Sequence, residues 1–159
     1  VLFTGGGIFF WWQAGWVSAR PGVEQARMVG MSAGALTAVL AKCGVGVEES
    51  LRVALEICDR YGVFRRPLGL LGCWGAIIRD WLDAVLPADA HVRCAGEVTI
   101  VVTAWEPFRW PPLRRLCVAD FGDRAELIDA CMASAHIPWF INGRFFATFR
   151  GRRCLDGSL

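Results

Sequence analysis

The chain has 159 residues, of which 55% are hydrophobic and 20% charged, and its formal net charge is +2. This length predicts a single domain with a sizeable core, and so apolar a composition excludes intrinsic disorder. Because 17 Lys and Arg face 15 Asp and Glu, a nucleic-acid partner recognised by charge alone is also excluded. The chain opens on Val1 and its last motif reaches the C-terminal end, so we expect one domain over 1–159, truncated at both ends.

Strands and helices alternate along the chain. The uncharged stretch 1–19 approaches the length of a membrane span, but its three glycines favour a buried strand, a turn and a helix. The continuous β-branched run at 98–104 is typical of a strand buried on both faces. Alternation of this kind predicts an α/β fold with a largely parallel sheet. Strands are expected at 1–4, 26–29, 98–104 and 115–119, and helices at 8–18, 33–42, 48–61, 70–86 and 123–135.

Seven cysteines are spaced too widely to form a CxxC pair. Such spacing predicts no metal site and favours reduced thiols used as small hydrophobic residues in an intracellular protein.

The segment Gly30-Met31-Ser32-Ala33-Gly34 is a G-x-S-x-G motif between a predicted strand and a predicted helix. A tight turn there would lift the Ser32 hydroxyl out of the sheet, and Gly30 and Gly34 leave room for the strained backbone. The N–H groups that follow, beginning at Ala33, would then face a developing negative charge. The motif predicts a serine nucleophile.

Gly5, Gly6 and Gly7 join the first strand to the first helix, where backbone N–H groups can hold an oxyanion or a phosphate. A dinucleotide site needs G-x-G-x-x-G, and Phe10 occupies the place of its third glycine.

The general base has two candidates. A Ser-His-Asp triad would use Ser32, Asp129 and His136, although Asp129 and His136 lie on or just after one predicted helix. The other candidate is Asp156, which precedes Gly157 after an extended segment at 146–149 and a predicted turn at 150–153.

Taken in order, Thr4 to Gly7, Gly30 to Leu36, Ala130 to Pro138 and Phe149 to Gly157 resemble the patatin-like phospholipase family. The resemblance implies a three-layer α/β/α sandwich with a mainly parallel central sheet. It also implies a Ser-Asp dyad that cleaves lipid esters, with Ser32 as nucleophile and Asp156 as base. Gly5 to Gly7 and Ala33 would form the oxyanion hole, without any cofactor.

Phe9, Phe10 and Ser158 depart from the family pattern, which has a basic residue or glycine in the loop and glycine or alanine after Asp-Gly. Phe10 and Ser158 favour one alternative, a catalytically inactive lipid-binding relative with the same fold. A second alternative is a Ser-His-Asp esterase that uses His136.

The stretch 105–115 combines aromatic residues, arginines and prolines, which predicts an exposed loop. Trp and Arg suit the membrane interface, so this loop predicts peripheral contact with a membrane or lipid droplet, unless its aromatic side chains fold back onto the core. The candidate interface residues are Trp105, Phe108, Trp110, Arg114 and Arg115.

Overall fold

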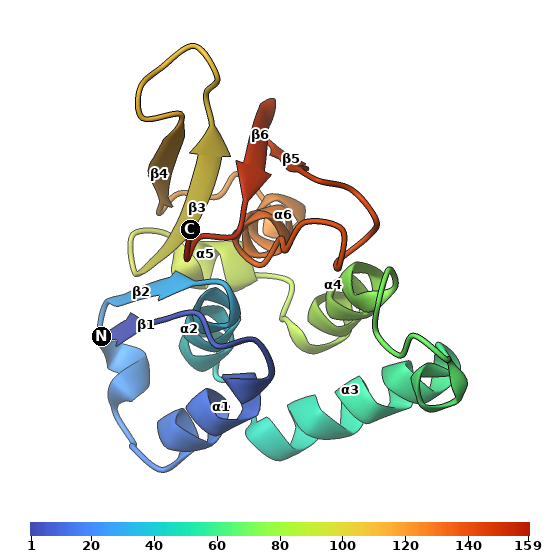
Figure 1. The fold of residues 1–159 in the computed structure, drawn as a ribbon. Coiled ribbons are helices and arrows are strands. Elements are labelled where there is room, and N and C mark those ends of the chain that lie inside the picture. Colours follow the sequence, from blue (N-terminus) through green and yellow to red (C-terminus); the bar gives the residue numbers. More distant parts are fainter.

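The computed structural model describes residues 1–159 and has the α/β architecture that the sequence predicts (Figure 1). The strands are β1 (Leu2–Phe3), β2 (Met28–Met31), β3 (Val98–Trp105), β4 (Leu113–Val118), β5 (Ala147–Phe149) and β6 (Arg152–Leu155). The helices are α1 (Phe10–Ser18), α2 (Ala33–Cys43), α3 (Val47–Arg60), α4 (Trp74–Val85), α5 (Ala90–Cys94) and α6 (Arg124–Ser134). No helix combines the length and the apolar character needed to cross a membrane.

The six strands form one sheet in the order β1-β2-β3-β6-β5, with β4 paired to β3. Strands β1, β2 and β3 are parallel, and β5 runs the same way because it is antiparallel to β6, which is antiparallel to β3. Four of the six strands therefore share one direction, and the sheet is mostly parallel.

Strand β3 organises the sheet because it pairs with three neighbours. Strand β4 covers one edge of β3 from Ile100 to Trp105. The opposite edge is shared: β2 pairs with it up to Val101, and β6 pairs with it at Thr103 and Ala104. Strands β2 and β6 thus approach each other end to end along one edge of β3.

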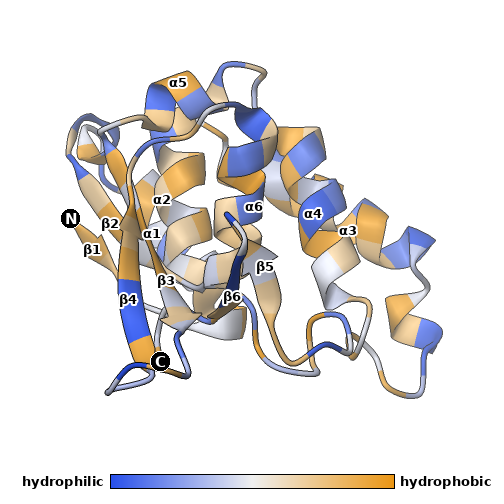
Figure 2. Ribbon diagram, turned by 90° about the horizontal axis from the view of Figure 1, so that it is seen from above, coloured by the Kyte–Doolittle hydropathy of each residue, from blue (hydrophilic) through white to orange (hydrophobic).

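The labelled helices lie on one side of the sheet (Figure 2). On that side, Phe3, Met28 and Val98 are buried. On the other face, the adjacent residues Leu2 and Val29 are exposed. Two layers of the expected sandwich are therefore seen here: the sheet, and the layer of helices that packs against it to form the core.

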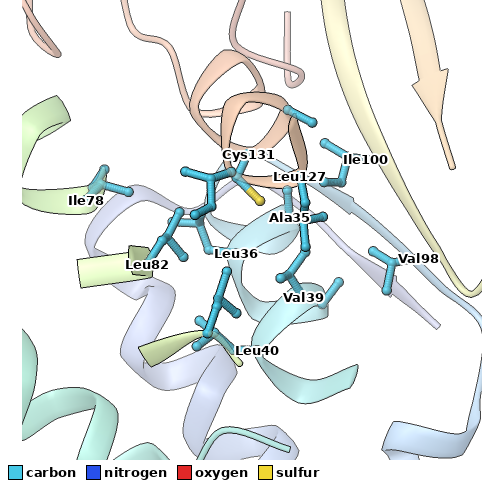
Figure 3. Close-up of a cluster of buried hydrophobic side chains, with 14 of the residues drawn as sticks. Ala35, Leu36, Val39, Leu40, Ile78, Leu82, Val98, Ile100, Leu127 and Cys131 are labelled. Carbon is cyan, nitrogen blue, oxygen red and sulfur yellow. The ribbon is translucent and has the colours of Figure 1, made fainter. Parts of the chain in front are cut away.

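Helix α2 is the centre of the core (Figure 3). Its Ala35 and Ala38 are fully buried, and small side chains of this kind let the helix lie close to the strands. At Gly34 an added Cβ would lie 2.2 Å from the carbonyl oxygen of Phe3, so only glycine fits there. Leu36 and Leu40 lie among side chains of α4 and α6, including Leu82 and Cys131.

Three expectations about the elements need correction. Residues 70–73 form turns, so the helix expected from residue 70 begins at Trp74. The five-residue helix α5 was not expected. The predicted turn at 150–153 is wrong in its second half, because Arg152 and Arg153 pair with Phe149 and Thr148 in a hairpin.

The helix expected to start after Asp123 is confirmed, with the Asp123 carboxylate accepting the Glu126 N–H at 2.7 Å.

Candidate active site

Ser32 occupies the sharp turn between β2 and α2. Its backbone has φ 54° and ψ −128°, a combination that costs a residue with a side chain on the order of 1–3 kcal/mol. Gly30 permits the turn, because an added Cβ would lie 2.4 Å from the Gly34 carbonyl oxygen. The strand-turn-helix geometry that the G-x-S-x-G motif predicts is therefore present.

The Ser32 side chain donates a hydrogen bond to the Asp156 carboxylate, with 2.6 Å between Oγ and Oδ2. Both residues are buried, although 124 positions separate them in the chain. The second carboxylate oxygen, Oδ1, accepts the Ser158 N–H at 2.8 Å, which fixes the plane of the carboxylate. A buried carboxylate on a serine hydroxyl can accept its proton during nucleophilic attack.

The sheet topology brings these two residues together. Ser32 follows the last residue of β2 and Asp156 follows the last residue of β6, and the two strands end facing each other along β3. The Ser134 hydroxyl joins the ends: it donates to the Val101 carbonyl at 2.7 Å and accepts the Ser32 N–H at 2.8 Å. Gly157 donates its N–H to the Ser134 carbonyl at 2.9 Å, which ties the Asp156 side of the junction to the same residue.

The glycine loop lies beside Ser32. A Cβ at Gly5 would lie 3.3 Å from the Ser32 Cβ and 2.1 Å from the Ser158 hydroxyl. Gly5, a predicted oxyanion residue, and Ser32, the predicted nucleophile, are therefore neighbours. Ala33 is the first residue of α2, so the helix itself does not use its N–H.

A buried polar pair, Gln13 and Thr37, supports the loop. The Gln13 amide nitrogen donates to the Thr4 carbonyl at 2.9 Å, and the Thr37 hydroxyl donates to the Gln13 amide oxygen at 3.0 Å. The start of the glycine loop is thereby attached to α2, the helix that follows Ser32. Phe10, one of the departures from the family pattern, is buried at the start of α1 against Trp81 and Trp11.

The histidine alternative is not assembled in this geometry. His136 is 1% exposed, and burial lowers its pKa, which favours the neutral ring. Its contribution to the site is its backbone carbonyl, which accepts the Asp156 N–H at 2.9 Å. Asp129 forms an ion pair with Arg79 on the surface and no hydrogen bond with His136. The Ser32 hydroxyl donates to Asp156 instead.

An apolar cavity of about 270 Å³ opens at Ser32. It extends between α1, α3 and α4, and 19 of its 21 lining residues are hydrophobic. Ser32 and Ala33 belong to the lining, with Leu36, Trp74, Ile78 and Trp81 among the apolar side chains. Ser32 thus borders a space suited to a hydrocarbon chain.

The candidate interface residues divide into two groups. Trp105 is half-buried and stacked on Phe146, with 5.0 Å between ring centroids, so the expectation of exposure is wrong for it. Phe108 and Trp110 are 100% and 93% exposed. Arg114 and Arg115 are exposed, but they belong to β4, so the loop is confined to residues 106–112.

A serine on a strand-to-helix turn, bonded to a buried carboxylate and flanked by a glycine loop, has the geometry of a serine acyl-transfer site. The chain belongs to the patatin-like phospholipase family, whose model matches residues 1–159. It is 32% identical over 99% of its length to human omega-hydroxyceramide transacylase. It is 33% identical over 84% of its length to human patatin-like phospholipase domain-containing protein 5, and 31% identical over 86% to a human 1-acylglycerol-3-phosphate O-acyltransferase. The chain spans 30%, 30% and 28% of the lengths of these relatives.

Sequence reasoning missed two residues of this site, Ser134 and Gln13. Ser134 stands among small residues at the end of α6, and nothing local to it indicates a bond to a residue 102 positions away. Gln13 carried a usable signal, because it is the one polar residue between Gly7 and Gly15. No group of three or more His, Cys, Asp or Glu residues lies close enough to hold a metal ion.

Proposed function

We propose that the chain is a lipid acyl hydrolase domain in which Ser32 and Asp156 form the catalytic dyad. The observation that carries the proposal is the 2.6 Å hydrogen bond from Ser32 Oγ to Asp156 Oδ2 at the opening of an apolar cavity. Membership of the patatin-like phospholipase family supports the same assignment.

In the first step Asp156 takes the proton from Ser32 Oγ as this oxygen attacks the ester carbonyl carbon. The carbonyl oxygen becomes an oxyanion, which the N–H groups of the Gly5–Gly7 loop and of Ala33 stabilise. When the tetrahedral intermediate collapses, the ester C–O bond breaks and the leaving alcohol takes the proton from Asp156. Ser32 then carries the acyl group, whose chain occupies the cavity between α1, α3 and α4.

In the second step a water molecule gives a proton to Asp156 and attacks the acyl carbon. The Ser32 ester bond breaks, Ser32 recovers the proton and the fatty acid leaves. The substrate is a lipid ester. The cavity lining favours a substrate with a hydrocarbon chain, because only two of its 21 residues are not hydrophobic. We propose that the domain meets this substrate as a peripheral protein at a membrane or lipid-droplet surface.

A second outcome of the same acyl-enzyme is transfer to a lipid alcohol instead of water. The match to a transacylase over 99% of the chain favours this outcome, as does an acyl site with almost no polar lining for water. Both reactions share Ser32, Asp156 and the acyl-enzyme, and they differ only in the acceptor.

A fluorophosphonate probe tests the proposal, since it labels only an activated serine. We expect the wild-type chain to be labelled and the Ser32→Ala chain to remain unlabelled. An unlabelled but folded wild-type chain would instead support the inactive lipid-binding relative. Product analysis with a lipid ester, with and without a long-chain alcohol, then separates free fatty acid from the transferred ester.

A further inference from the structure

The loop between β3 and β4 presents two aromatic side chains to solvent. Phe108 is 100% exposed and Trp110 is 93% exposed, although removing either side chain from water would lower the free energy. Three prolines, Pro107, Pro111 and Pro112, restrict the backbone of the loop. A stiff loop of this kind loses little conformational entropy when its tip enters an apolar phase.

Beside this tip lies a shallow hollow lined by arginines. Arg109, Arg114, Arg152 and Arg153 line it together with a single carboxylate, Glu106. Arg152 donates to Glu106 at 2.9 Å, and the guanidinium groups of Arg109 and Arg114 lie 3.7 Å from it. Three guanidinium groups therefore surround one carboxylate, and their positive charge is only partly neutralised.

The remaining cation of the hollow is held by aromatic rings instead of a carboxylate. The Arg153 guanidinium lies 5.5 Å from the Trp105 ring centroid and 5.8 Å from that of Phe146. The N–H groups of Arg153 can therefore still donate hydrogen bonds to an anion. Planar guanidinium groups match the oxygens of a phosphate better than other side chains do.

The arginine hollow carries a concentrated positive charge. Its four arginines (109, 114, 152 and 153) and Glu106 give it a net charge of +3. The whole chain has a net charge of +2, so all other residues together carry −1. An anionic surface would therefore attract this side of the molecule and orient it.

Connections that supply lining residues of the apolar cavity lie on this side as well. Ile8 and Phe64 line the cavity and are nevertheless 81% and 74% exposed. The connections from β3 to β4, from α6 to β5 and from α3 to α4 all lie along the lower edge of Figure 2. The β3–β4 loop and the connections that border the cavity thus lie along one edge of the molecule.

We propose that the tip residues Phe108 and Trp110 and the arginine hollow form a docking surface for an anionic phospholipid bilayer. The two aromatic side chains enter the interfacial region, and the arginines bind headgroup phosphates beside it. In this orientation the cavity opens toward the same bilayer. The choice of a lipid partner rests on the proposed function, but the binding itself requires no catalysis.

Vesicle co-sedimentation of the Ser32→Ala chain tests docking apart from turnover. We expect stronger binding to phosphatidylcholine vesicles that contain phosphatidylserine than to phosphatidylcholine alone, and weaker binding as salt is added. Adding Arg114→Gln or Arg152→Gln should lower the partition coefficient for anionic vesicles roughly fivefold each. Adding Phe108→Ala with Trp110→Ala should lower it for both kinds of vesicle.

Two matched controls belong to the experiment. Arg27→Gln removes an arginine that is more exposed than Arg114 and Arg152 and lies just before β2, at the opposite end of that strand from Ser32. Trp12→Ala removes an exposed tryptophan from α1. Both should bind as the parent chain does. Equal binding to neutral and anionic vesicles, or equal losses in the controls and the surface variants, would overturn the proposal. Because every chain compared carries Ser32→Ala, a failure of the catalytic assignment would leave these results unchanged.

Discussion

Replacing Gly34 by alanine tests whether close contact between α2 and β1 holds the candidate site together. The added Cβ would lie 2.2 Å from the Phe3 carbonyl oxygen and 2.6 Å from that of Thr4, whereas ordinary contacts begin at 3.4 Å. The backbone of β1 must therefore move by more than 1 Å, since a carbonyl cannot rotate away as a side chain can. Overpacking of this kind costs roughly 3 kcal/mol, offset by about 1 kcal/mol from the better helix propensity of alanine.

Gly15→Ala is the matched control, because Gly15 is also helical and an added Cβ there would meet nothing within 4 Å. That variant should gain about 1 kcal/mol from helix propensity alone. We expect thermal unfolding to show Gly34→Ala below the wild-type chain by about 4–8 °C, from roughly 2–4 °C per kcal/mol. Fluorophosphonate labelling should slow up to about 100-fold, because the shift displaces the glycine loop from Ser32. Equal melting temperatures for the two variants would refute the packing argument.

Three further predictions concern the polar groups of the site. Ser32→Ala and Asp156→Asn should each abolish ester hydrolysis in folded protein, whereas His136→Gln and His91→Ala should leave most of it; equal losses for Ser32→Ala and His136→Gln would favour a triad. Gln13→Leu should lower kcat more than it raises KM, because it releases the Thr4 carbonyl. Gln13→Glu should recover less than half of the kcat that Gln13→Leu loses. An unchanged kcat in Gln13→Leu would contradict this role. Burial lowers the pKa of His136, so near pH 6.5 the unfolded chain binds a proton that the folded chain does not. The free energy of unfolding should therefore be highest above that pH and should decrease as the pH falls below it. Urea unfolding at several pH values should show this fall, and His136→Gln should flatten it.

The sequence by itself determined the elements whose signals are local. The glycines around Ser32 predicted a strained strand-to-helix turn because they leave room for its closely approaching backbone, and the turn is present. Asp123 and Glu126 predicted a capped helix, and the capping hydrogen bond is formed. The β-branched run at 98–104 predicted the central strand, because burial selects such side chains.

Only the tertiary structure decided which of these local features meet. Asp156 has an ordinary turn sequence, and its place beside Ser32 follows from β2 and β6 ending against each other along β3. Ser134 and Gln13 were missed for the same reason, since their hydrogen bonds reach residues in other elements. Trp105 and Trp110 stand in one apolar, arginine-rich stretch, yet only Trp105 has a ring to stack on, from Phe146. Contacts between distant segments depend on strand order and register, and no single stretch of sequence carries that information.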